Sequence, residues 1–393
     1  MMVLRAAARL GLVPVAIFLL VSCGFSDGIP QSEAGGLEGG PTYTLVPLQG
    51  VTPAELDAER AARRTIPFFD GHVRSPLDGK TYAFQIAGKP PGKSDETTTV
   101  PYVAIFLAVH YPDGTVLDPR QPACGDTISV EQRFLGGPNI VPVRTVSNGV
   151  DVGTVQLGDG FQRAEFWHIL RRTPHYHTVL GAIGPPMTVS VNAPASSKTF
   201  KGVCAGAAHR IGEIPIADFV PTVRRVIERH AASAQAAIVL AYNTFQVGRY
   251  GNCCINGLHG AFKRPSGVQV FAAATYNDAG AVRYYRQIAD INAATHEIGE
   301  LLNDPFALPN GRANMAPAWG HVGQYSNGCS PYFEVGDPLD ATAYRLKRHN
   351  FTYHPQELAF FSWFFRTKPI GTGRKYSLEG TFTTAQGLCS SSS

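Results

Sequence analysis

Residues 294–305 read ATHEIGELLNDP, and this stretch decides how the second half of the chain folds. It overlaps the end of a longer segment, 281–302, in which apolar residues recur at helical spacing. Asp304 and Pro305 should end the helix, because proline disfavours helical backbone in the residue before it. The sequence therefore predicts a long helix that carries one histidine and two glutamates in its last turns.

The spacing of these three charged residues predicts a metal site. Residues four apart lie on one helix face, so His296 Nε2 and the Glu300 carboxylate can hold one ion from the same side. Glu297 is turned by about 100° from His296. It can therefore reach a water beside the metal, where a carboxylate would act as general base.

Downstream residues can complete the site. Either Glu334 or His321 could supply the third ligand, and Asp337 could be a further ligand or an acceptor that orients an imidazole. Tyr325 is a candidate hydrogen-bond donor to a developing oxyanion. Asp304, followed by proline, is predicted to end the helix instead of binding metal. The predicted ion is Zn²⁺, although an oxygen-rich site would also admit Mn²⁺ or Ca²⁺.

The same stretch resembles the H-E-x-x-E-x-x-x-D-P signature of a group of uncharacterised exported bacterial proteins, which are similar to zincin metallopeptidases around this helix. Further segments carry the resemblance, namely 317–321, 334–338, 353–363 and, more weakly, 159–164 and 252–254. The resemblance implies a metallohydrolase fold but no substrate. Glu300 stands where the zincin pattern H-E-x-x-H has its second histidine.

Three functions compete. The first is a zinc-dependent endopeptidase or related amide hydrolase, with a peptide or protein as substrate. The second is a non-catalytic protein that holds Ca²⁺ or a structural metal and binds a partner or glycan. The third is a glycosidase with Glu297 and Glu334 as its paired carboxylates, which would require a sugar-sized groove between them.

The predicted fold class is α+β, with two folded regions. Residues 65–212 contain short alternating runs and should form a β-rich, sandwich-like domain, whereas residues 213–393 should form a zincin-like α+β domain. Strands are expected at 82–86, 102–110, 127–134, 141–146, 187–191, 236–245 and 268–275, and helices at 160–167 and 214–234. His175 and His177 could form a metal pair on one strand face, but such spacing is more often incidental.

The N-terminus predicts export. Residues 1–22 combine two arginines with an apolar run too short to remain as a membrane span, so they read as a signal peptide. The run ends at Cys23, which resembles the lipidated cysteine of bacterial lipoproteins and would anchor the chain to an envelope membrane. An ordinary signal peptide with an incidental cysteine is the alternative. Residues 23–64 should form a flexible tether with one short helix at 53–64.

Composition agrees with export. Charged residues make up 16% of the chain and the formal net charge is +4, which indicates neither nucleic-acid binding nor a polybasic membrane patch. Besides Cys23, the sequence has six cysteines, namely Cys124, Cys204, Cys253, Cys254, Cys329 and Cys389. The sequence has no C-x-x-C pair, which a zinc cluster would typically need, so we expect three disulfides. The expected pairs join Cys124 to Cys204, and Cys253 and Cys254 separately to Cys329 and Cys389.

Overall fold

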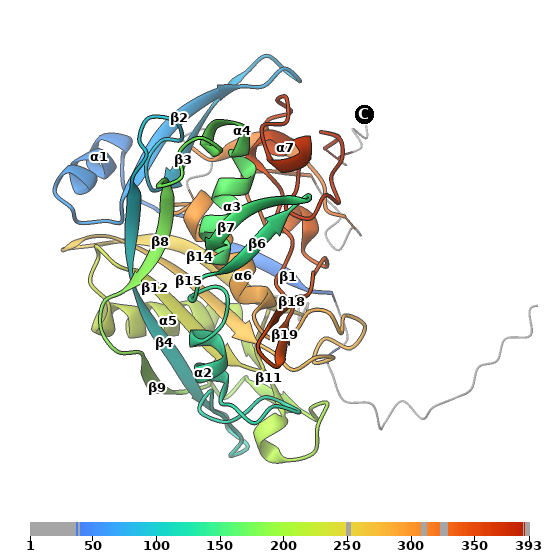
Figure 1. Ribbon diagram of the computed structural model, residues 1–393. Coiled ribbons are helices and arrows are strands. Elements are labelled where there is room, and N and C mark those ends of the chain that lie inside the picture. The colour runs from blue at the N-terminus through green and yellow to red at the C-terminus, as the bar shows by residue number, and fades with distance from the viewer. Residues whose placement is uncertain are drawn as a thin grey trace, which may run out of the picture. The chain divides into compact units, whose positions relative to one another are not determined.

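One curled eleven-stranded sheet is the frame of a mixed, strand-rich α/β fold (Figure 1). The main path of the sheet runs β10-β11-β13-β14-β15-β12-β4-β5, while β1 joins beside β14, and β8 and β9 join beside β4. This computed structural model describes Leu37 and residues 40–248, 253–307, 313–322, 329–387 and 389. Residues 35–393 form one compact unit.

The strands of the main sheet are β1 (Thr42–Val46), β4 (Thr97–His110), β5 (Val116–Leu117), β8 (His177–Ala182), β9 (Met187–Asn192), β10 (Lys198–Phe200), β11 (Ile211–Pro215), β12 (Ala236–Tyr242), β13 (Thr244–Val247), β14 (Ile255–Arg264) and β15 (Gly267–Tyr276). Antiparallel pairs outside it are β2 (Phe68–Arg74) with β3 (Thr81–Ala87), β6 (Val143–Ser147) with β7 (Val150–Val155), β16 (Met315–Trp319) with β17 (Ser330–Tyr332), and β18 (Leu346–Arg348) with β19 (Phe351–Tyr353). The helices are α1 (Pro53–Ala61), α2 (Val130–Leu135), α3 (Leu157–Glu165), α4 (Trp167–Leu170), α5 (Ile216–His230), α6 (Asn292–Asn303) and α7 (Phe361–Phe364), with 3₁₀ turns η1 (Ala207–His209), η2 (Asp337–Leu339) and η3 (Thr372–Arg374).

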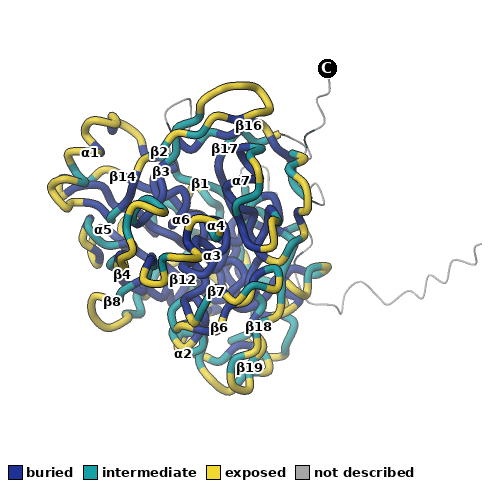
Figure 2. Tube along the Cα trace, turned by 45° about the horizontal axis from the view of Figure 1, so that its top comes forward, coloured by how far each residue is buried: buried dark blue, intermediate teal, exposed yellow. Residues whose placement is uncertain are grey.

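Helices α5 and α6 cover opposite faces of the sheet. In β12, Ile238 and Leu240 pack in the same core as the apolar side of α6, whereas Ala237 and Val239 pack with α5. Alternate residues of a strand point to opposite faces, so a strand covered on both sides must be apolar throughout. All of β12 and all of α6 are accordingly buried, and Figure 2 shows both in the buried colour.

The central pairing joins the two regions that the sequence separates at residue 212. β4 lies parallel to β12, with Ile105 opposite Val239. β4 also pairs in parallel with β8 and β9, so strands from 65–212 and from 213–393 share one sheet. The region 65–212 therefore does not build a sandwich of its own, because its longest apolar strand is covered by elements from the other region.

Three predicted elements differ from the structure. The single strand expected over 236–245 is two strands, β12 and β13, which separate at Asn243, where φ is 44°. The expected strand over 127–134 is the helix α2, which begins after Ser129, whose side chain accepts a hydrogen bond from the Gln132 backbone N–H. The long helix begins at Asn292 instead of Ala281. Asp290 has a φ of 45°, a left-handed conformation that a right-handed helix cannot contain.

Part of the segment expected as a tether is folded. β1 pairs in parallel with β14, and α1 forms within the predicted helix, capped by Thr52 and Glu55. Residues 42–61 thus contribute to the folded unit. Cys23 lies outside the described residues.

Three disulfides are present. The expected Cys124–Cys204 bond is confirmed, but Cys253 and Cys254 bond to each other and Cys329 bonds to Cys389. The prediction for the last four was wrong because a cysteine count does not identify bonding partners. Cys254 is buried just before β14, where its backbone N–H donates to the Gly40 carbonyl. The disulfides indicate an oxidising, extracellular compartment. Within the described part of the chain, no helix combines the length and apolarity needed to cross a membrane.

Candidate metal centre

The centre lies where α6 packs on β14. Leu258 faces the α5 side of the sheet, so its neighbours Gly257 and His259 face α6. α6 presents His296, Glu297 and Glu300 toward this surface. Segments that follow β17 and α6 in the chain add three carboxylates, from Asp304, Glu334 and Asp337.

The first set of potential ligands contains His296, Glu300 and Asp337. His296 Nε2 lies 3.1 Å from Glu300 Oε1 and 3.5 Å from Asp337 Oδ1. The backbone N–H of Gly336 donates to the same Glu300 oxygen at 3.0 Å, which fixes the carboxylate. The sequence prediction placed His296 and Glu300 on one ion, and the structure brings these two residues together with Asp337.

A glutamine orients the His296 ring. Gln356 Nε2 donates to the Gly336 carbonyl at 2.7 Å, so its Oε1 faces His296 Nδ1 at 3.1 Å. An amide oxygen can only accept, so the neutral His296 ring carries its proton on Nδ1, and Nε2, which faces the two carboxylates, is the nitrogen that could bind a cation. Tyr43 stacks on the ring at a centroid distance of 3.4 Å. This arrangement is typical of a metal-binding histidine held by an outer hydrogen bond.

The second set surrounds His259. Its Nδ1 lies 3.1 Å from Glu300 Oε2 and 3.6 Å from Glu297 Oε2, and its Nε2 lies 3.6 Å from Glu334 Oε2. Asp304 belongs to the Nε2 side, since it forms a group with His259 and Glu334 whose ligand atoms lie within 4.8 Å of one another. Glu300 thus lies between the two histidines, with one oxygen toward each.

All five distances suit pairs of ligands on an ion, and the three of 3.5–3.6 Å are too long for good hydrogen bonds. Metal–ligand bonds of roughly 2.0–2.2 Å place two ligands about 3–3.6 Å apart, whereas N–H···O bonds cluster at about 2.7–3.2 Å. His259 Nδ1, His259 Nε2, His296 Nε2, both Glu297 oxygens and Glu334 Oε1 are buried without a hydrogen-bond partner. Buried polar atoms are seldom left unpaired, so this cluster of six fits divalent cations.

Burial and mutual charge shift the titration of the whole centre. Burial raises the pKa of Glu297 to about 7 and that of Asp304 to about 6, against the opposing effect of the histidines. Burial also raises the pKa of Glu334 well above its usual value. For His259 and His296, burial lowers the pKa, but the surrounding carboxylates outweigh it and raise the pKa well above the ordinary range.

The Glu297 side chain makes few polar contacts within the centre. It has no exposed surface, and neither carboxylate oxygen has a hydrogen-bond partner. The Glu297 side chain fits here because residue 257 is a glycine. A Cβ added to Gly257 would lie 2.4 Å from Glu297 Oε1. β14 is therefore shaped to leave room for this carboxylate.

Of the remaining predicted residues, Glu334 reaches the His259 side of the centre. His321 lies 3.3 Å from Asp340 and outside both ligand sets. Tyr325 falls outside the described residues. The sequence prediction did not include His259 and Asp304 among the potential ligands. The signal for His259 was its place on a strand between Gly257 and Ala261, two small residues on the face that receives the helix.

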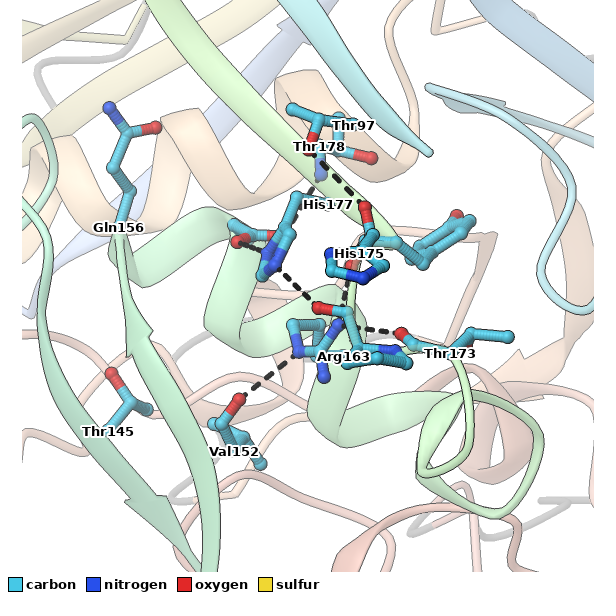
Figure 3. Close-up of polar contacts among 12 residues, drawn as sticks. Thr97, Thr145, Val152, Gln156, Arg163, Thr173, His175, His177 and Thr178 are labelled. Carbon is cyan, nitrogen blue, oxygen red and sulfur yellow. Dashed lines mark hydrogen bonds and ion pairs between the residues drawn. The ribbon is translucent and has the colours of Figure 1, made fainter. Parts of the chain in front are cut away.

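The H-x-H pair does not form a metal site. His177 binds Asp159 Oδ2 through Nδ1 at 2.7 Å and the Pro174 carbonyl through Nε2 at 3.1 Å, so both nitrogens are engaged. His175 is exposed, and its backbone N–H binds Asp95. Figure 3 shows His177 beside Arg163, which donates to the carbonyls of Val152 and Tyr176. This cluster fastens α3 to β7 and to the segment that precedes β8.

The geometry therefore gives one buried centre with two histidines, five carboxylates and a helix–strand contact that positions them. Glu300 connects its two halves. Comparisons with protein-family models, with curated proteins and with solved structures find no match.

Proposed function

We propose that this chain is an exported metal-dependent hydrolase. The observation that carries the proposal is the convergence of His296 Nε2, Glu300 and Asp337 beside the Glu297 carboxylate, which has no hydrogen-bond partner. The nearest charged neighbour of Glu297 is His259 Nδ1 at 3.6 Å, too far for a good hydrogen bond. A buried carboxylate without a hydrogen bond is costly, and a fold retains one most readily where it takes part in chemistry.

The residues suit hydrolysis by an activated water. A divalent cation, when bound, supplies Lewis acidity toward a water or a carbonyl oxygen. Glu297 would accept the proton of the attacking water. Gln356 and Gly336 would hold the two ligands in place during the reaction.

We propose a peptide or other amide as the substrate class, by analogy with the zincin arrangement of a ligand-bearing helix beside a strand. Asp337 has a side chain 23% exposed, whereas the other ligands are buried. A substrate would therefore approach from the Asp337 side. One nitrogen and two carboxylate ligands suit Zn²⁺ and would also admit Mn²⁺.

The place of action is part of the proposal. Residues 1–22 would direct export, and a lipid on Cys23 would hold the enzyme at an envelope membrane. The disulfides support an extracellular location, but they do not distinguish a lipid anchor from a simple cleaved signal peptide. Mass spectrometry of the mature N-terminus separates the two cases.

The decisive test is Glu297→Gln. Loss of the general base should lower the hydrolysis of a casein-type substrate by about 10²–10⁴-fold while the metal content stays unchanged. Glu228→Gln is the matched control, because Glu228 lies on α5, on the opposite face of the sheet, in an exposed pair with Arg224. Wild-type activity in the Glu297 variant would refute the hydrolase.

A non-catalytic metal-binding protein is the second candidate, and the burial of nearly every ligand favours it. In that case metal would bind and stabilise the fold, and no amide substrate would be cleaved by the wild type. Partner or glycan binding would then have to be sought on other surfaces.

A further inference from the structure

We propose that the centre binds a second divalent cation, held by His259 Nε2, Glu334 and Asp304. This trio is distinct from the group of His296, Glu300 and Asp337, with which it shares no residue. It goes beyond the proposed hydrolysis, because it concerns how many ions the fold holds and stands whether or not the chain is an enzyme.

The first support is the state of the His259 ring. It is fully buried, and neither ring nitrogen has a hydrogen-bond partner. Nε2 lies 3.6 Å from Glu334 Oε2, too far for a good hydrogen bond but suited to two ligands of one ion. The other Glu334 oxygen is also buried and unpartnered.

The second support is that Asp304 is pre-oriented. Its Oδ1 accepts hydrogen bonds from the Ala307 backbone N–H at 2.8 Å and from the Asn314 side chain. These contacts hold the carboxylate in one orientation within the His259 group. The sequence pattern explains Asp304 as a helix-ending residue, but burial of its carboxylate at the centre is not needed for that role.

The third support is charge. Glu297, Glu300, Asp304, Glu334 and Asp337 place five carboxylates around two histidines. Among the described residues, no lysine or arginine forms an ion pair with any of them. Buried carboxylates need counter-charge, which protons supply in the metal-free chain. Two divalent cations could supply it in their place.

The second cation is placed on the Nε2 side of His259 and not on the Nδ1 side. The Nδ1 side offers Glu297 and Glu300, but Glu300 already faces His296 through Oε1. If Nδ1 keeps its proton, it faces two carboxylates, and Nε2 has its lone pair toward Glu334. Glu300 then supports both halves of the centre, as a ligand on one side and as a carboxylate beside the ligating imidazole on the other.

The test is metal stoichiometry of the purified, metal-stripped full chain titrated with Mn²⁺ and with Zn²⁺. We expect two ions per chain in the wild type and one in His259→Gln and in Glu334→Gln. Asp337→Asn should lose the other ion. One ion in the wild type, or two retained in both His259→Gln and Glu334→Gln, would overturn the second site. Loss of the second ion in Glu297→Gln, with two retained in Glu334→Gln, would overturn the assignment to Nε2.

A measurement on the wild type guards against variants that fail to fold. Two neighbouring Mn²⁺ ions couple magnetically, so the paramagnetic resonance spectrum should change from the six-line signal of an isolated ion to a coupled signal at the second equivalent. An isolated-ion signal at saturation would contradict the inference. A single bound ion with loss of hydrolysis in Glu297→Gln would reject the second site and leave the proposed hydrolase standing.

Discussion

At the scale of single residues, Gln356 shows how the centre fixes the tautomer and orientation of His296. Its amide is fixed by the Gly336 carbonyl, and it accepts the His296 Nδ1 proton. The ring cannot then turn or take the other tautomer without breaking a buried hydrogen bond. The orientation of the ligand is thus built into the protein.

This arrangement predicts the effect of Gln356→Met, which keeps the volume of the side chain and removes the acceptor. Affinity for Zn²⁺ should fall by about 10–100-fold, the usual cost of losing the partner of a ligating histidine. Competition with a chromophoric chelator measures it. Gln121→Met, at an exposed position, is the control and should bind as the wild type does. Equal affinities in the two variants would mean that Gln356 does not orient the ligand.

At the scale of elements, the close contact between β14 and α6 creates the space for the Glu297 carboxylate. Gly257 lies opposite Glu297, where an added Cβ would meet the Oε1, Cγ and Cδ atoms of that side chain at 2.4, 2.6 and 2.9 Å. All three atoms lie beyond the Glu297 Cβ. The clash therefore belongs to this pair of residues, so it can be relieved from either side.

A double-mutant cycle tests the contact. Gly257→Ala should destabilise the fold by about 1–3 kcal/mol through overpacking. In a Glu297→Ala background most of that cost should disappear, which gives a coupling energy of about the same size. Chemical denaturation of the four proteins measures it. Additive effects would show that Gly257 and Glu297 do not share the space.

How far the sequence predicts this site depends on the kind of element. The helix around His296 was predictable because its periodicity and ligand spacing are local. His259 was not, because a lone histidine on a strand gains meaning only when the register of β14 and the packing of α6 are known. The pairing of β4 with β12 joins residues more than a hundred positions apart, and no local pattern specifies such a partner.

The vicinal Cys253–Cys254 bond and the late start of α6 were missed for a related reason. Cysteine counts give the number of disulfides but not their partners. The apolar residues of 281–291 have helical spacing, but the left-handed Asp290 accepts, through Oδ2, a hydrogen bond from His354 Nδ1 at 2.7 Å. Long-range contacts thus override local preference in both cases.

At the scale of the whole molecule, the centre links pH, metal and stability. The pKa of Glu297 rises on folding from 4.5 to about 7, and that of Asp304 from 3.8 to about 6. The folded chain thus binds these protons more tightly than the unfolded chain, so stability falls as pH rises through this window. The raised pKa values of His259 and His296 act in the same direction at higher pH. Glu300, whose pKa is lowered by the histidines despite its burial, acts oppositely but only below about pH 4.5.

Divalent cations should restore the stability that the fold loses as pH rises, because they replace the protons that the centre gives up. For the metal-stripped chain, we expect the melting temperature to fall between pH 5 and pH 8. The increase in melting temperature on adding saturating Mn²⁺ should grow over the same range. Glu297→Gln, which removes one titrating group, should reduce the pH dependence of the metal-free protein, whereas Glu228→Gln should not. Calorimetry at several pH values measures both quantities. A metal-induced increase that is constant or shrinks toward pH 8 would show that these carboxylates and histidines do not bind the ion, since protons and metal must compete for the same atoms.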